Sequence, residues 1–263
     1  GSGLVGSEMC IRDRFIYIHA LLMLFRCAFL VIYSGQLGNA GAEDVAEALW
    51  LGARISLKTT AFLVGFPFVF GTIPYALWKK WPAGGIRKIL GSVAVGLMTL
   101  LFMVRIPYYE IFHQGFNIML FNGMKDDRMA IWQTAVQQYQ LWPRLFGALA
   151  LMAFFIWGLI KFLETPVYYP RHHVRILDMA AVVMVPVFAV FCRFGGAFHS
   201  DSGVPWESAA RTHYTVLNEA VLDDGQAMYR AYHTHARATQ RAMRSISDGE
   251  LYEAIAALSL IHI

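Results

Sequence analysis

The sequence predicts an all-α fold: a five-helix transmembrane bundle with outer amphipathic helices and an extracytoplasmic C-terminal linker helix. Three observations predict it. First, 57% of the 263 residues are hydrophobic and only 15% are charged, against about 25% charged residues in an ordinary soluble domain. Second, five apolar segments approach the ~20 residues that a helix needs to cross a bilayer. Third, a polar stretch with helical periodicity follows the last of them.

Each predicted span is an apolar run with few charges. The spans are residues 15–34, 56–78, 88–106, 143–163 and 176–194. The third and fourth are the clearest, whereas Arg26 interrupts the first and Asp178 the fifth. Prolines also interrupt the second span and the fifth, which predicts kinks or irregular turns within them.

The two ends of the chain differ from what lies between them. Residues 1–14, "GSGLVGSEMCIRDR", and residues 258–263, "LSLIHI", join abruptly to the neighbouring sequence and resemble translated sequencing-adapter read-through. The alternative for the first is a natural signal-like start with Arg12 and Arg14. We therefore expect a transmembrane domain over residues 15–194 and an extracytoplasmic helical linker over residues 195–257.

The basic residues of the loops predict the orientation in the membrane. The loop between the second and third spans contains "KKWPAGGIRK", four basic residues and no acid, and the next loop on that side is also basic. The loop between the first two spans is acidic, and residues 107–142 are nearly balanced. Because Lys and Arg concentrate in cytoplasmic loops, we expect the N-terminus inside and the segment after the fifth span outside.

Three segments outside the spans have apolar residues at helical spacing. Residues 43–54 fit either an interfacial helix or the extended start of the second span. Residues 107–142 fit two short helices, 108–121 and 126–140, that either pack on the bundle or form a mobile loop. Residues 215–230, "TVLNEAVLDDGQAMYR", fit one amphipathic helix whose apolar stripe needs the outer face of the bundle or a further domain to cover it.

Ionisable residues inside spans are costly and indicate candidate sites. The candidates for binding an anionic lipid head group, such as that of phosphatidylglycerol, are Arg26, Lys58, Arg105 and Arg193. For the last three, snorkelling to the interface is the simpler interpretation. Arg26 is too central to snorkel, so we expect it to face the interior and to bind backbone carbonyls or a carboxylate. Asp178 is the intramembrane acid that would be its partner if their depths coincide.

Motifs for soluble catalysis and for metal binding do not occur in the sequence. There is no P-loop, GxGxxG, HExxH or GxSxG sequence, and the three cysteines have no zinc or disulfide spacing. The histidine pairs are adjacent or two residues apart, so they do not share a helix face. We therefore expect no catalytic residue, cofactor or metal in this chain, and no nucleic-acid partner for a net charge of only +4.

Three stretches resemble the membrane half of the lipoteichoic acid synthase family, which belongs with the sulfatase-like phosphoglycerol transferases. They are "LGARISLKTTAFLVGFPFVF" (51–70), "FNGMKDDRMAIWQTAVQQY" (121–139) and "VPWESAARTHYTVLNEAVLDDGQAMYRAY" (204–232). The first resembles the family's Gly-x-Arg-aromatic-Asp-Leu pattern. It departs from that pattern because Ile55 and Ser56 stand where the aromatic residue and the aspartate are common.

The resemblance implies a membrane anchor for an extracytoplasmic catalytic domain. In the family, that domain has a catalytic threonine and a divalent metal, usually manganese, and transfers glycerol phosphate from phosphatidylglycerol at the outer face of the membrane. None of these catalytic residues can be assigned to a position here, so the chain alone is expected to be inactive. Two alternatives stay open: a non-enzymatic membrane module that binds lipid or a partner, and part of a polytopic transporter.

Overall fold

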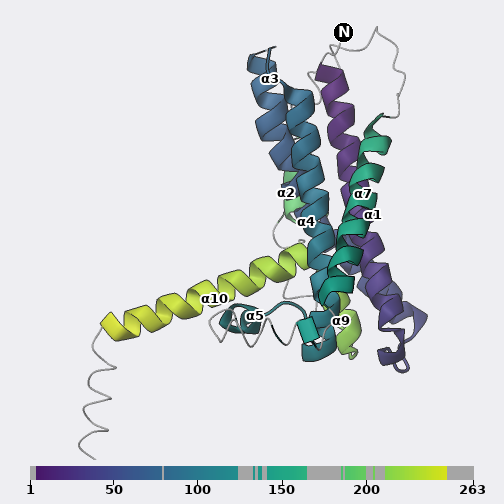
Figure 1. Ribbon diagram of the computed structural model, residues 1–263, viewed down its shortest axis with the longest axis vertical. Helices are drawn as coiled ribbons and strands as arrows, with labels where there is room; N and C mark the ends of the chain where they lie inside the picture. Colours follow the sequence, from purple (N-terminus) through teal and green to yellow (C-terminus); the bar gives the residue numbers. More distant parts are fainter. Residues whose placement is uncertain are drawn as a thin grey trace, which may run out of the picture.

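The computed structural model describes residues 4–78, 80–123, 133, 136–137, 141–164, 185, 187–199, 204 and 211–247. Within these residues every regular element is helical, so the predicted all-α class is confirmed. Four long helices stand side by side as a bundle (Figure 1). They are α1 (Leu4–Ile32), α2 (Ala42–Pro67), α4 (Ala83–Phe112) and α7 (Leu141–Glu164).

These four helices account for four of the predicted membrane spans. Stretches Ile11–Ile32, Ala42–Tyr75, Ala83–Phe112 and Leu141–Glu164 are long and apolar enough to cross a membrane. The chain is therefore built as a multi-pass membrane protein. The predicted fifth span, 176–194, lies mostly outside the described residues, although 187–193 are helical.

The helices are longer than the apolar runs that predicted them. α2 begins at Ala42, where the Asp44 carboxylate accepts a hydrogen bond of 2.9 Å from the Gly41 amide. The positive end of the helix dipole also stabilises acidic residues in the first turn. Residues 43–54 are therefore the start of the second span, and the alternative of a separate interfacial helix is wrong.

Proline marks irregular backbone in the second span, as the sequence predicts. α2 ends at Pro67, and a π-helical turn, η2 (Phe68–Thr72), connects it to the short α3 (Ile73–Leu77). Proline lacks the amide hydrogen that continues an α-helical ladder. The turn Ser34–Gln36, η1, lies at the opposite end of the bundle, between α1 and α2.

The segment between the third and fourth spans differs from the prediction. α4 continues to Phe112 and ends where His113 adopts a left-handed conformation with φ of 51°. The next helix, α5 (Ile118–Gly123), is therefore shorter than the predicted 108–121. The predicted helix 126–140 lies outside the described residues except for helical positions 133, 136 and 137.

The C-terminal segment forms two helices instead of one. α9 (Thr215–Val221) ends at Leu222, whose extended backbone (ψ of 131°) breaks the helix, and α10 (Asp224–Ser247) starts directly afterwards. In Figure 1, α9 lies at the lower end of the bundle, while α10 leaves the bundle sideways. α9 packs against α1 and α2, and the first part of α10 packs against α4 and α5.

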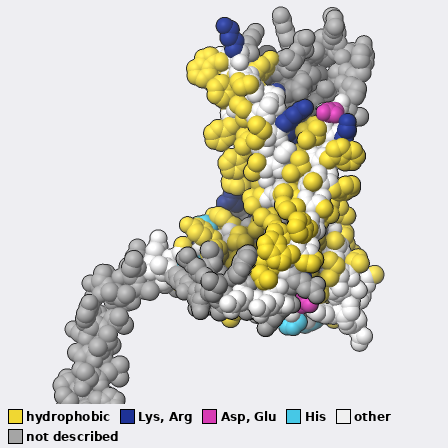
Figure 2. Space-filling model, in the orientation of Figure 1, with side chains coloured by type: hydrophobic (Ala, Val, Ile, Leu, Met, Phe, Trp, Pro, Cys, Tyr) yellow, Lys and Arg dark blue, Asp and Glu magenta, His cyan; other side chains and the backbone are white. Residues whose placement is uncertain are grey.

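Figure 2 shows hydrophobic side chains along the outer surface of the bundle and basic side chains near its upper end. That end carries Lys80, Lys88 and Lys161, from the described part of the two loops that the sequence identified as basic. The bundle interior is also apolar, and Phe25 stacks on Phe102 with ring centroids 4.5 Å apart. A surface that is apolar between polar ends is typical of a helix bundle surrounded by lipid.

A buried polar junction as candidate functional site

The short helix α9 is buried at the end of the bundle. Val216, Leu217, Ala220 and Val221 are each at most 4% exposed and belong to the main hydrophobic core. The apolar stripe that the sequence predicted is thus covered, but by the interior of the bundle rather than by its outer face. Because α9 has only 7 residues, most of its C-terminal carbonyls have no partner within the helix. They require hydrogen-bond donors from elsewhere.

Arg26 supplies donors to two of these carbonyls. Its Nε donates to the Ala220 oxygen at 2.8 Å, and one terminal nitrogen donates to the Val221 oxygen at 3.1 Å. The same terminal nitrogen donates to Ser56 Oγ at 2.7 Å. The guanidinium cation also lies at the negative end of the α9 dipole, where a positive charge is favoured. The expectation that Arg26 faces the interior and binds backbone carbonyls is confirmed, since the residue is 3% exposed.

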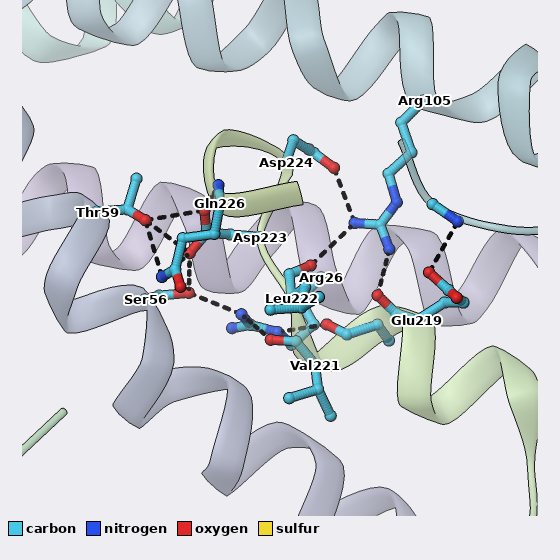
Figure 3. Close-up of polar contacts among 12 residues, drawn as sticks. Arg26, Ser56, Thr59, Arg105, Glu219, Val221, Leu222, Asp223, Asp224 and Gln226 are labelled. Carbon is cyan, nitrogen blue, oxygen red and sulfur yellow. Dashed lines mark hydrogen bonds and ion pairs between the residues drawn. The ribbon is translucent and has the colours of Figure 1, made fainter. Parts of the chain in front are cut away.

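Arg105 holds the same turn from α4 (Figure 3). It donates to the backbone oxygen of Glu219 at 2.6 Å and forms an ion pair of 2.8 Å with Asp224 Oδ1. Its guanidinium also lies over the ring of Phe29, 4.1 Å from the centroid, in the geometry of a cation–π contact. At 4% exposed, Arg105 is buried, so the prediction that it snorkels to the interface is wrong.

Asp223 connects the break between α9 and α10 to α2. Its carboxylate accepts hydrogen bonds from Ser56 Oγ at 3.1 Å and from Thr59 Oγ1 at 2.9 Å. It also accepts a hydrogen bond of 3.0 Å from the backbone N–H of Gln226, which is an N-cap interaction for α10. The side-chain Nε2 of Gln226 in turn donates to the backbone oxygen of Ile55 at 2.7 Å. The turn is therefore bonded to α1, α2 and α4 together.

We call this set the junction network; its members are Arg26, Ser56, Thr59, Arg105, Asp223, Asp224 and Gln226. It contains two buried cations and two buried anions, each at most 5% exposed, so its formal charges cancel. Burial raises the pKa of the Asp224 carboxyl above its ordinary value, and Arg105 opposes that rise. Buried charges are tolerated when they are paired and hydrogen-bonded. The network meets that condition and fixes the place where α10 begins.

The chemistry of the junction network is that of a structural lock. No group of three or more potential metal ligands occurs among the described residues. The hydroxyls of Ser56 and Thr59 face a carboxylate, and no described histidine or cysteine takes part in the network. Each hydroxyl donates to the Asp223 carboxylate, and these bonds hold the turn between α9 and α10 against α2.

The other predicted site residues do not join the network. Lys58 is half-buried and donates to the Val204 backbone oxygen. Arg193 is exposed at the end of helical residues 187–193. Asp178 lies outside the described residues. Lipid binding at any of these positions stays a prediction.

Sequence reasoning missed most of the network. It identified the two arginines, but it placed Asp223 and Asp224 inside one continuous amphipathic helix, 215–230, and assigned neither a role. The signal that was available is the sequence "LDDGQ" (222–226). An aspartate before a glycine is a common helix boundary, and an aspartate three residues before a glutamine fits a helix cap.

Comparison with known protein families, with curated proteins and with solved structures finds no significant match.

Proposed function

We propose that this chain is the membrane domain of a lipoteichoic acid synthase-like phosphoglycerol transferase of the sulfatase family. In this role it anchors and orients an extracytoplasmic catalytic domain that acts on phosphatidylglycerol at the outer face of the membrane. The observation that carries the proposal is the junction network. It joins the bundle to the first residue of α10, a helix of 24 residues that projects from the bundle.

A rigid connection suits an anchor better than a flexible linker does. A catalytic domain that attacks a lipid head group has to be held at the height of that head group, because correct placement of reactants supplies much of a catalytic rate. A helix whose N-terminus is fixed by Asp223 and Asp224 transmits the orientation of the bundle to whatever follows it. A lock made only of paired, buried charges gives less support to a transporter, which needs polar groups exposed to a pathway.

Ser56 stands where the chain departs from the family pattern. The family pattern has an aspartate at this position, beside the interior of the bundle. Here Ser56 bonds to both Arg26 and Asp223, so the carboxylate near Arg26 comes from the C-terminal segment.

The proposed topology has five spans, with the basic end of the bundle in the cytoplasm and both α9 and α10 outside. The fifth span is the predicted 176–194, of which 187–193 are helical. At about 1.5 Å per residue, α4 rises by about 33 Å from Ala83 to Arg105. That distance is close to the ~30 Å of a hydrocarbon core. Arg105 and the junction network would then lie at the outer boundary of the apolar layer.

The complete reading frame tests this proposal. We expect it to continue after α10 into a domain with a threonine nucleophile and a divalent metal, probed with manganese. Proteoliposomes of the complete protein should release diacylglycerol from fluorescent phosphatidylglycerol when manganese is present. A frame that continues only into further spans would support a transporter and exclude the transferase. A frame that ends without another domain would leave a lipid- or partner-binding module.

A further inference from the structure

α10 has its basic residues on one face. Its sequence "DGQAMYRAYHTHARATQRAMRSIS" contains four arginines, Arg230, Arg237, Arg241 and Arg244, and one acid, Asp224. At 3.6 residues per turn, the four arginine positions fall within about 60° of one another around the helix axis. The single acid lies in the first turn, where it is buried against Arg105. We call the four positions the arginine stripe.

The face opposite the arginine stripe is packed against protein. Ala231 is buried with Tyr108 and Phe116, and Met228 packs on the same cluster. Farther along α10, Tyr232 and His235 contact the ring of Phe121, at centroid distances of 6.0 and 5.5 Å. α5 therefore covers this face of α10, and the helix face that carries the arginine stripe is turned away from α5.

The position of α5 indicates which way that face is turned. In Figure 1, α10 leaves the bundle sideways and α5 lies beneath it, on the side away from α3. The face with the stripe accordingly looks toward the end of the bundle that carries α3, which is the side occupied by the membrane-spanning parts of the helices. α10 begins beside Thr59 and Met98, whose side chains lie 3.1 and 3.4 Å from where a β-carbon on Gly225 would be. It thus starts from the flank of the spans and not from their tip.

We propose that α10 lies along the membrane surface at this end of the bundle and binds the phosphates of anionic phospholipids through the arginine stripe. The charges are complementary, since the four arginine positions share one face of the helix and an anionic leaflet carries phosphate groups. Arginine also binds phosphate oxygens in a bidentate geometry. Tyr229, 65% exposed at the border of the stripe, is a residue type that favours the head-group region. The proposal does not depend on the transferase assignment.

A fluorescent label on α10 tests the proposal in the whole chain. The three native cysteines are replaced by alanine, Gln240→Cys is introduced beside the stripe, and the cysteine is labelled with an environment-sensitive dye. The protein is reconstituted in vesicles of phosphatidylcholine alone or with phosphatidylglycerol. We expect aqueous dithionite to reduce the dye at least about fivefold more slowly in the anionic vesicles. A factor of about five corresponds to the attraction of a single arginine to a charged surface, and is therefore the smallest effect expected of the stripe. High salt should remove the difference.

Two matched variants identify the groups responsible. Replacing all four arginines by glutamine should remove the protection, whereas replacing all four by lysine should retain most of it because the charge is kept. Protection that is equal in neutral and anionic vesicles, or unchanged in the glutamine variant, would overturn the proposal. In that case another protein surface, and not lipid, covers the stripe. Because Arg105 and Asp223 are unaltered, the unfolding midpoint of each variant provides a check that the bundle is folded.

Discussion

At the scale of the residue, the ion pair of Arg105 and Asp224 is a deeply buried charge interaction. Both side chains are at most 5% exposed and their charged atoms are 2.8 Å apart. Arg105 also donates to the Glu219 carbonyl, so its removal would leave a buried carboxylate and a helix end unsatisfied. Removing one partner of a buried pair is more damaging than the pair is stabilising.

We therefore predict that Arg105→Met lowers the free energy of unfolding by about 3–5 kcal/mol, measured by denaturation in detergent micelles. Arg144→Met is the matched control. Arg144 forms an exposed pair with Glu110 at 3.5 Å, and such pairs contribute about 0–1 kcal/mol. Equal effects of the two substitutions would show that Arg105 has no special role in stability.

At the scale of the element, α9 and α10 show how a helix pattern in sequence can be divided by tertiary contacts. Residues 215–230 have continuous helical periodicity, yet the backbone breaks at Leu222. The break is stable because Arg26 and Arg105 bond the last carbonyls of α9 while Asp223 caps α10. A continuous helix would bond these carbonyls internally and would leave the arginines without them. The elements that surround the break therefore decide its position.

Gly52 on α2 permits this arrangement, and Gly52→Ala tests it. A β-carbon there would collide with the guanidinium of Arg26, which cannot move away without losing its bonds to α9. We predict a loss of about 1–3 kcal/mol in the free energy of unfolding, the usual cost of overpacking. Gly65→Ala, in the same helix, is the control, because nothing lies within 4 Å of the place that its β-carbon would take. That substitution should be neutral or stabilise by up to about 1 kcal/mol, and the same loss at both sites would contradict the argument.

At the scale of the whole molecule, the helices alternate in direction and place the connections at two ends. The turn at Ser34–Gln36 and helix α9 lie at one end, while α3 and the start of α4 lie at the other (Figure 1). Tyr214, just before α9, comes within 4.0 Å of a β-carbon placed on Gly38. The C-terminal segment thus returns to the loop between α1 and α2. This agrees with the alternation that the basic loops predict.

Cysteine labelling in intact cells tests the orientation. In a cysteine-free background, we predict that an impermeant maleimide labels Gln36→Cys and His213→Cys and does not label Gly84→Cys until the membrane is permeabilised. All three positions are exposed in the structure, so failure of labelling would reflect the membrane and not burial in the protein. The reverse pattern would overturn the proposed orientation, and labelling of only one of the first two would contradict the fold itself.

Much of the fold could be predicted because hydropathy is a local property of the chain. Each of the four observed helices overlaps one predicted span, and the prolines of the second span lie on either side of the π-helical turn. The predictions failed where apolarity did not define the boundary. α2 begins well before its apolar run because Asp44 and the helix dipole stabilise polar turns, and α4 continues past Pro107 to Phe112.

The candidate site was predicted only in part. The position of a charged residue within an apolar span predicts that the residue is buried, but it does not identify the groups that the residue binds. The position of Arg26 within an apolar run was sufficient to predict that it faces the interior. Its partners Ala220 and Val221 are 194 and 195 positions away along the chain. Arg105 was expected at the interface because its depth was judged from its distance to the end of the span. Helix α9 packs against Arg105 and buries it, and no local pattern in the sequence indicates this contact.

The sequence by itself determined that this is an all-α membrane protein with a polar helical segment after its spans. It could do so because the free energy of moving a side chain from water to lipid depends mainly on the side chain itself. Only the tertiary structure decided that this segment enters the bundle, breaks at Leu222 and is held there by Arg26, Arg105 and Asp223. Those bonds depend on the depth and rotation of four packed helices, which no local pattern of residues specifies.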